Sequence, residues 1–439
     1  MPRSQQSSSS PSNKLQSRRR FLRGAAKASA LAVAAPMIIP GHVLGKDGAV
    51  PTSERITLGA IGIGNRGSYV FKCFLAENDV HTLAVCDVNA KRKAAAKQAA
   101  DERNGNTDCA TYNDLRQLLD RKDIDAVIIA TGPNWHAVAS SIAARAGKDV
   151  YCEKPCSKTI NESLMLADVF RRTGRVFQAG TQRRSLPHFM YAIDLARRGR
   201  LGKLTALHAQ PRGLIDKMSG WYPAEPAPPK EELDWDMMLG PAAYRPYNKA
   251  LTNSFNFEKG GGFVGGMGGG GTLEWGSHCA DLCQVANDAD GTAPIEYEPQ
   301  GNRLVCTYAN GVKLVFRDDG WLPLGSCPVR FEGSDGWVET ADDGDIMASN
   351  ANLLAGRRQK IGGYPANFHV RNFLDCVKSR SQPRANADAA CWSHITCNAA
   401  NIALFLNRKL KFDPAKCEFV NDAEANRLRS EARREPWRV

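Results

Sequence analysis

The chain has 439 residues, of which 43% are hydrophobic, 24% charged and 8% aromatic. This length predicts two or three domains, and the composition excludes a disordered, a collagen-like and an integral membrane protein. Eight of the 58 lysine and arginine residues, but one of the 46 acidic residues, lie in residues 1–50, so this segment carries most of the +12 net charge. The rest has no basic stripe, and we expect no nucleic-acid partner.

Residues 17–23 read Ser-Arg-Arg-Arg-Phe-Leu-Arg and precede an alanine-rich, weakly apolar stretch that ends near Leu44. This pattern resembles a twin-arginine export signal, and the stretch is less apolar than a transmembrane helix. The resemblance implies that the twin-arginine translocase exports the folded, cofactor-loaded protein to the periplasm. An uncleaved membrane anchor remains an alternative because no Ala-x-Ala tripeptide closes the segment, and so does a basic tail on a cytosolic protein.

The thirteen cysteines are scattered singly through apolar stretches. Cys152/Cys156 and Cys279/Cys283 have three residues between them, which differs from the paired spacing of zinc and redox sites. We therefore expect small buried side chains, no structural disulfide and no metal site.

A short apolar run from Ile56 to Ile61 leads directly into a GxGxxG turn. A helix (69–75) and a second strand (81–85) follow, and Asp87 ends that strand 20 residues after Gly67. Glycines allow close approach to a pyrophosphate, a helix N-terminus offers free N–H groups, and a carboxylate binds a ribose diol. The order predicts a dinucleotide site formed by Gly62, Ile63, Gly64, Asn65, Arg66, Gly67 and Asp87.

The choice between NAD and NADP depends on Asp87, because a carboxylate repels a 2′-phosphate. Lys91 and Arg92 lie four and five residues further on and are basic groups that could turn towards a phosphate, although a solvated helix face is their ordinary role. We expect NAD and keep NADP as the alternative.

Two more strand ends carry polar loops. A five-residue apolar strand (126–130) ends at a loop, a helix (137–146) follows, and the strand 150–152 leads into Glu-Lys-Pro. Open parallel sheets bind ligands at the carboxyl ends of their strands. We therefore expect the cofactor site to include Thr131, Pro133, Asn134, Trp135, His136, Glu153, Lys154 and Pro155.

The motifs GIGNRG, ATGPNWH and CEKP together resemble the Gfo/Idh/MocA oxidoreductases, and the similarity runs from about Arg55 to Trp437. GTQRRS at 180–185 resembles the exported bacterial subgroup of this family. The resemblance and the strand pattern predict an α/β protein with an N-terminal Rossmann dinucleotide-binding domain and a C-terminal α+β domain with an open, mostly antiparallel sheet. We expect a signal and linker at 1–50, the Rossmann domain at 54–181 and the substrate and oligomerisation domain at 182–439.

The family resemblance also suggests catalytic residues. It implies that Lys154 lies beside the nicotinamide and hydrogen-bonds the substrate hydroxyl, and that His278 takes a proton. Glu274 stands where the family usually has Asp, which puts its contribution in doubt. If the segment is helical, Glu274 and His278 share one face, and the carboxylate could hold the imidazole in one tautomer. A core histidine and a structural glutamate are the alternatives.

Candidate substrate-binding residues begin with Gln182 and Arg183, whose polar side chains could bind sugar hydroxyls. Trp221 and Tyr222 lie in a loop and could stack on a sugar ring, and Asp281 follows His278. Surface charges, subunit contacts and a loop aromatic packed on its own domain are the alternatives. Nine of the twelve residues from Gly260 to Gly271 are glycine, which predicts either a mobile flap over the pocket or an insertion without function.

The second half shows alternating strand patterns at 303–308, 312–316 and 329–332, and helical patterns at 368–378 and 387–406. We expect an open sheet with helices on one face. Its other face would bury against a second copy in a dimer or tetramer, as the family resemblance implies.

The leading hypothesis is an exported oxidoreductase that transfers hydride between a retained nicotinamide cofactor and a sugar or polyol carbon. One alternative is a redox-assisted glycoside hydrolase or lyase, in which transient oxidation permits elimination and reduction closes the cycle. Another alternative is a nucleotide-binding protein without catalysis.

Overall fold

A computed structural model describes residues 50–211, 213–214, 222–252, 267–317, 325–355, 360 and 362–437. The export-signal segment therefore lies outside the described residues. Residues from Arg55 onward form one compact unit, separate from the unit 1–54. Within the described part of the chain, no helix has the length and apolar character needed to cross a membrane.

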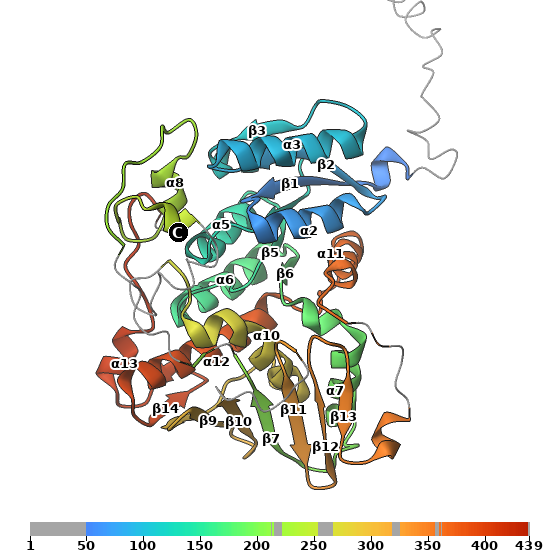
Figure 1. The fold of residues 1–439 in the computed structure, drawn as a ribbon, viewed down its shortest axis with the longest axis vertical. Helices are drawn as coiled ribbons and strands as arrows, with labels where there is room; N and C mark the ends of the chain where they lie inside the picture. Colours follow the sequence, from blue (N-terminus) through green and yellow to red (C-terminus); the bar gives the residue numbers. More distant parts are fainter. Residues whose placement is uncertain are drawn as a thin grey trace, which may run out of the picture. The chain divides into compact units, whose positions relative to one another are not determined.

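The first sheet has six parallel strands in the order β3-β2-β1-β4-β5-β6, which is a Rossmann arrangement (Figure 1). Its strands are β1 (Ile56–Ile61), β2 (Val80–Cys86), β3 (Ala110–Tyr112), β4 (Ala126–Ile129), β5 (Asp149–Cys152) and β6 (Phe177–Ala179). The crossover helices are α2 (Asn65–Leu75), α3 (Ala90–Asn104), α4 (Leu115–Leu119), α5 (Pro133–Arg145) and α6 (Ile160–Thr173). The central strands β1, β4 and β5 are almost wholly buried because helices cover both faces.

Helix α2 begins at Asn65, four residues earlier than the sequence pattern indicated. The residue before it, Gly64, is the N-cap and gives no side-chain cap, so the Asn65-Arg66-Gly67 segment forms the first turn of the helix. Gly67 is required there because a Cβ atom would stand 2.5 Å from the Gly62 carbonyl oxygen. The glycine motif therefore includes the helix N-terminus itself.

The second sheet has nine strands in the order β13-β12-β11-β7-β10-β9-β8-β14-β15, and only the β7–β10 pair is parallel. The expected mostly antiparallel sheet is thus confirmed. Its strands are β7 (Leu204–Ala209), β8 (Glu296–Gln300), β9 (Arg303–Thr307), β10 (Lys313–Arg317), β11 (Val329–Gly333), β12 (Gly336–Thr340), β13 (Ile346–Ala348), β14 (Leu410–Asp413) and β15 (Glu418–Phe419).

Helices α7 (Pro187–Arg197), α10 (Gly271–Ala286) and α12 (Ala387–Leu406) pack with this sheet around the largest apolar cluster. Helix α11 (Asn367–Ser379) was expected to cover the second sheet, together with the other helices of the second half. It packs against α2 and the first sheet, where Phe373 contacts Phe74 and Tyr151, so the second half of the chain completes the core of the first. All thirteen cysteines are buried, as expected, and carry free thiols.

Candidate active site

A cavity of about 280 Å³ lies at the carboxyl edge of the first sheet and extends to α10. The glycine turn, the ends of β2, β4 and β5, and residues of the second half line it together. The expected site residues that line it are Gly62, Gly64, Asn65, Arg66, Asp87, Thr131, Pro133, Trp135, His136, Glu153, Lys154, Gln182, Arg183, Glu274 and His278. Residues separated by more than 200 positions therefore meet in one space.

The glycine turn is shaped to admit a ligand close to the backbone. Gly62 has φ +76°, and a Cβ atom there would lie 2.5 Å from Thr131 Cγ2. A Cβ atom on Gly64, by contrast, would meet only Arg92, at 3.6 Å from Nη1. The space beside Gly64 at the uncapped N-terminus of α2 suits a pyrophosphate.

Asp87 is buried at the end of β2, and its two carboxylate oxygens accept hydrogen bonds from the N–H groups of Ile63 and Asn89, at 2.7 and 2.8 Å. Burial raises the pKa of this carboxyl, while the two N–H donors and Arg92 oppose that rise. Ile63 does not line the cavity and contributes this backbone contact. Because a carboxylate has about four acceptor positions, Asp87 retains capacity for a ribose diol.

The loop after β4 is held by its own side chains. The ring nitrogens of His136 lie 2.7 Å from the Pro155 oxygen and 3.1 Å from the Thr131 oxygen, and burial lowers the pKa of this histidine. Asn134 does not line the cavity, and its side-chain amide donates instead to the Leu239 oxygen at 2.7 Å. Pro155 likewise lies outside the lining and follows a cis peptide bond.

Glu153 connects three parts of the site. Its Oε1 accepts hydrogen bonds from Arg66 Nε at 3.1 Å and Gln182 Nε2 at 2.7 Å, and its Oε2 accepts from the Lys154 N–H at 3.2 Å. The carboxylate is almost fully buried. Glu153 therefore links the glycine turn to the Lys154 backbone and to the start of the second half.

Lys154 extends from the first half to α10. Its Nζ donates to the Glu274 main-chain oxygen at 2.9 Å and lies 3.7 Å from Glu274 Oε2 and 5.4 Å from the centre of the Trp275 ring. The other carboxylate oxygen of Glu274 accepts from the Gly269 N–H at 3.0 Å. Glu274 therefore compensates the charge of Lys154 and fixes the start of α10.

His278 lies one turn beyond Glu274 in α10 and lines the cavity. Burial lowers its pKa well below the ordinary value, and the positive charges of Arg183, Lys154 and Arg66 lower it further. Its Nδ1 atom has no hydrogen-bond partner among the described residues, so the expected contact with the Glu274 carboxylate is not formed. The imidazole is thus neutral, with one ring nitrogen available for a proton.

The cavity lining also contains Gln182, Arg183 and an exposed aromatic residue, Tyr364, that the sequence patterns did not indicate. Both Arg183 Nε and Nη2 donate to Asp342, at 2.8 and 2.5 Å. The Tyr364 ring is 46% exposed, lines the cavity, and lies 5.2 Å from the Arg183 guanidinium and 5.8 Å from that of Arg66. A loop tyrosine gives no local pattern, so only the spatial arrangement identifies it.

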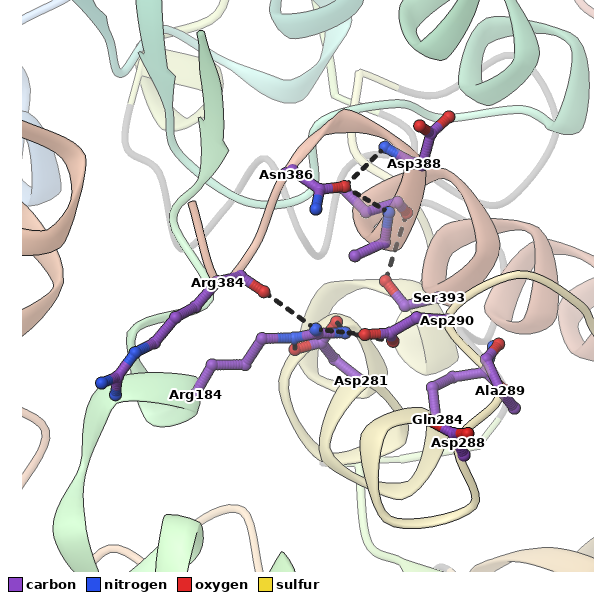
Figure 2. Close-up of polar contacts among 12 residues, drawn as sticks. Arg184, Asp281, Gln284, Asp288, Ala289, Asp290, Arg384, Asn386, Asp388 and Ser393 are labelled. Atoms are coloured by element: carbon purple, nitrogen blue, oxygen red, sulfur yellow. Dashed lines mark hydrogen bonds and ion pairs between the residues drawn. The ribbon is translucent and has the colours of Figure 1, made fainter. Parts of the chain in front are cut away.

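Asp281 is not placed to bind substrate, which corrects the expectation from its proximity to His278. Both of its oxygens accept from Arg184, at 2.6 and 2.8 Å, and the residue does not line the cavity. Arg184 also donates to both oxygens of Asp290 at 2.8 Å and to the Arg384 oxygen at 3.0 Å (Figure 2). This buried network ties the start of the second half to α10.

Of the two aromatic residues expected to stack on a sugar ring, Tyr222 does not line the cavity. Tyr222 packs against a small apolar cluster formed by Trp235, Leu239, Leu251 and Met267. Trp221 and residues 253–266, which include most of the glycine-rich stretch, lie outside the described residues. The flap hypothesis therefore stays a prediction.

Two family models match the chain. The NAD-binding Rossmann fold of the oxidoreductase family matches residues 56–181, and the C-terminal alpha/beta domain of that family matches residues 217–439. The chain belongs to the Gfo/Idh/MocA oxidoreductase family. The glycine turn, the free N-terminus of α2 and the carboxylate of Asp87 fit the NAD(P) cofactor of this family.

Relatives within the Gfo/Idh/MocA family carry different names. A glycosyl hydrolase family 109 protein of Saccharopolyspora erythraea is 36% identical over 131 residues, which are 29% of this chain and 28% of that protein. Inositol 2-dehydrogenase 2 of the same species is 28% identical over 173 residues, which are 39% of this chain and 48% of that protein. Both matches thus cover less than half of the relative.

The fold agrees with solved structures of this family. Myo-inositol 2-dehydrogenase from Lactobacillus plantarum superposes with a TM-score of 0.58 at 16% identity, over 82% of this chain and 100% of that one. At this identity the likeness shows the fold, and the substrate has to be argued from the residues of the cavity.

Proposed function

We propose that the protein is an exported NAD-dependent oxidoreductase that acts on a sugar or polyol and keeps its cofactor bound. The observation that carries the proposal is that Lys154 and His278 line the same cavity as the glycine turn and Asp87. When bound, the dinucleotide supplies a nicotinamide that accepts and returns hydride.

Lys154 and His278 are the proposed proton-handling pair. Lys154 Nζ has further donor capacity beyond its 2.9 Å bond to the Glu274 oxygen, so it can hold a substrate hydroxyl oxygen. Since the pKa of His278 is depressed, its imidazole is neutral near pH 7 and can accept the hydroxyl proton. The main-chain oxygen and the carboxylate of Glu274 hold the Lys154 side chain in position.

The preference for NAD rests on Asp87. Its buried carboxylate faces the space where a ribose would lie, and a 2′-phosphate would be repelled there. Arg92 also lines the cavity, and its Nη2 donates to the Thr252 oxygen at 3.1 Å. We propose that this guanidinium contacts the phosphates common to NAD and NADP.

Substrate binding is assigned to Gln182, Arg183 and Tyr364. The side-chain oxygen of Gln182 is buried without a partner among the described residues, which favours a hydroxyl donor from a ligand. The exposed Tyr364 ring offers a surface against which the apolar face of a sugar can pack. Such a site suits a polyhydroxylated ring.

Export through the twin-arginine route and assembly into a dimer or tetramer remain parts of the proposal. The motif at residues 17–23 supports export, and a periplasmic enzyme without a soluble NAD pool would need to retain its cofactor. The second sheet supports assembly, because its strands alternate buried residues such as Val329 and Phe331 with half-exposed Arg330 and Glu332 on the other face.

A second candidate function is cleavage of a glycoside with no net redox change. The glycosyl hydrolase family 109 relatives support it, since two of them are 36% and 34% identical to this chain over 131 and 126 residues. The same proton-handling residues would serve both reactions. A free sugar product without accumulation of a keto sugar would favour cleavage, and a stoichiometric keto sugar would exclude it.

The test begins with protein purified from the exported fraction without added cofactor. Mass spectrometry of the nucleotide released on denaturation should find about one NAD per chain, and adding sugars to the intact protein should reduce it, as seen by absorbance. An empty site with no affinity for added NAD or NADP would overturn the proposal.

A Gly64→Ala variant tests whether the nucleotide binds at the glycine turn. Its Cβ atom would stand 3.6 Å from Arg92, so the fold accepts it, yet it would occupy the space of the pyrophosphate. We expect loss of bound nucleotide with an unchanged melting temperature of the nucleotide-free protein. Gly291→Ala is the matched control, because no atom lies within 4 Å of that Cβ position.

A further inference from the structure

A segment of the second half covers the nucleotide side of the cavity. This segment, residues 229–252, is called the strap, and it contains α8 (Trp235–Leu239). The strap contributes Met237, Met238 and Thr252 to the lining of the same cavity that the glycine turn and Asp87 line. A dinucleotide bound at the glycine turn would therefore lie between the Rossmann loops and the strap.

The strap is tied to the loop after β2 by its backbone. Asn89 and Leu233 form an antiparallel bridge, the Ala90 N–H donates to the Glu232 oxygen at 3.0 Å, and the Asp234 N–H donates to the Val88 oxygen at 3.1 Å. This loop directly follows Asp87. Movement of the strap would therefore disturb the position expected for the ribose.

The strap is also tied to the N-terminus of α5. Trp135 Nε1 donates to the Met237 oxygen at 2.8 Å, and the Asn134 side chain donates to the Leu239 oxygen at 2.7 Å. Gly240, which ends α8, packs so closely on Trp135 that a Cβ atom would overlap the indole ring. These contacts give Asn134 and Trp135 a role in holding the strap, although Asn134 does not line the cavity.

A third element holds the strap from outside. Residues 431–437, called the tail, run beside α8 (Figure 1). The Arg434 N–H donates to the Pro241 oxygen at 3.0 Å, and its guanidinium donates to the Gly240 and Asp236 oxygens at 3.1 and 2.8 Å and pairs with the Asp236 carboxylate.

At its end, the tail contacts helices of the first half. Trp437 is 4% exposed, packs edge-on against Trp135 at 4.6 Å between ring centres, and lies under the Arg116 guanidinium at 4.9 Å. The tail thus passes from the strap to α4 and α5 and joins both. Neither Arg434 nor Trp437 lines the cavity, and the Trp437 N–H donates to the Arg434 oxygen at 3.0 Å, so the two residues act on the cavity through the strap and Trp135.

We propose that the tail fastens the strap over the bound dinucleotide, so that Arg434 and Trp437 are positioning residues that set how slowly the cofactor leaves. The inference rests on the proposed function, because it assumes a dinucleotide at the glycine turn. A nucleotide held between two elements can leave only when one of them moves, and each contact of the tail opposes that movement.

The test measures dissociation of NADH from the full chain. Proteins loaded with NADH are mixed with excess NAD, and the loss of NADH fluorescence gives the dissociation rate constant. We expect Trp437→Ala and Arg434→Ala to raise it roughly tenfold or more. Trp437→Phe should stay close to the parent because it keeps an aromatic ring on Trp135.

Two controls separate fastening from general stability. Arg408→Ala removes an exposed arginine that pairs with Asp422 and Glu424 and does not line the cavity. This variant should leave the NADH dissociation rate constant unchanged. Melting of the nucleotide-free proteins reports any loss of fold, and kcat with saturating NAD should stay near the parent value for the tail variants. A merely structural tail would lower melting temperature and kcat together.

The outcomes are distinct. If the parent holds nucleotide and the tail variants release NADH at the parent rate, the tail does not fasten the strap and this inference is overturned, while the proposed function stands. If the parent binds neither NADH nor NADPH, the proposed function fails, and the inference fails with it.

Discussion

The Glu153 carboxylate occupies the space in which a side chain on Gly180 would begin: a Cβ atom there would lie 2.8 Å from Glu153 Cδ and 2.9 Å from both of its oxygens. Gly180 directly follows β6, and its N–H donates to the Cys152 oxygen at 2.7 Å. A glycine in one strand-end loop therefore makes room for the carboxylate that connects Arg66, Lys154 and Gln182.

A Gly180→Ala substitution should displace Glu153 and with it the Lys154 backbone. We expect the stability to fall by about 1 to 3 kcal/mol, as for other overpacked sites, and kcat to fall at least roughly tenfold because Lys154 loses its position. Thermal melting and steady-state kinetics measure both effects. Gly291→Ala controls for the added methyl group, and an unchanged kcat in Gly180→Ala would contradict the role given to Glu153.

The pH dependence of kcat/KM should reflect His278. Because its pKa is depressed by burial and by Arg183 and Lys154, the imidazole stays neutral as the pH falls below the ordinary histidine value of about 6.5. The acid limb of the profile should therefore lie below that pH. His278→Gln should remove the limb and lower kcat by about 10² to 10⁴, and an acid limb retained in this variant would assign it to another group.

Asp281→Asn should affect stability and leave substrate binding unchanged. Arg184 would keep Asp290 but lose its fully buried partner, so we expect a loss of roughly 3 kcal/mol. The KM of the folded variant should match the parent. Asp288→Asn is the control, since its pair with Arg197 is exposed and worth less than about 1 kcal/mol. A raised KM in Asp281→Asn would restore its role as a substrate ligand.

Tyr364→Ala should raise the KM for the sugar substrate roughly tenfold through the lost stacking surface, while the bound nucleotide is retained. Tyr364→Phe should behave like the parent. Phe405→Ala, on an exposed ring of α12 outside the cavity, controls for loss of an exposed aromatic side chain. Equal KM values for Tyr364→Ala and the parent would remove this residue from the substrate site.

Stability should fall as the pH drops through the slightly acidic range. Burial lowers the pKa of His394 and His369 to about 4, below the unfolded value near 6.5. Each residue therefore contributes stability that is complete above about pH 6.5 and is lost as the pH falls towards 4. His394 Nδ1 lies 2.6 Å from the Ala390 oxygen and its Nε2 accepts from the Cys156 N–H at 2.9 Å, so protonation breaks a contact to the loop after Lys154.

His394→Gln should make melting less dependent on pH between about 7.5 and 5, a range in which ordinary carboxyl groups remain largely ionised. Melting at about pH 8 gives the cost of the substitution itself. A slope identical to that of the parent would show that His394 does not titrate with unfolding.

Local sequence patterns were sufficient for the nucleotide half. A buried strand, a glycine turn and a helix follow one another within twelve residues from Ile56 to Gly67, so the backbone requirement of each glycine is legible from its neighbours. The antiparallel sheet was predicted for a similar reason, because residues alternate between two faces within each strand. The candidate cofactor residues at the strand ends followed from the rule that parallel strands share one carboxyl edge.

The partners of those residues were decided by the tertiary structure. Lys154 meets Glu274 across 120 positions, Arg184 meets Asp281 across 97, and Arg434 reaches Gly240 of the strap across 194. No periodicity within a helix or strand encodes such contacts, because they depend on how separate elements pack. For this reason the sequence patterns indicated neither the pairing of Asp281 with Arg184 nor that of Glu274 with Lys154, nor the place of Tyr364 in the cavity lining.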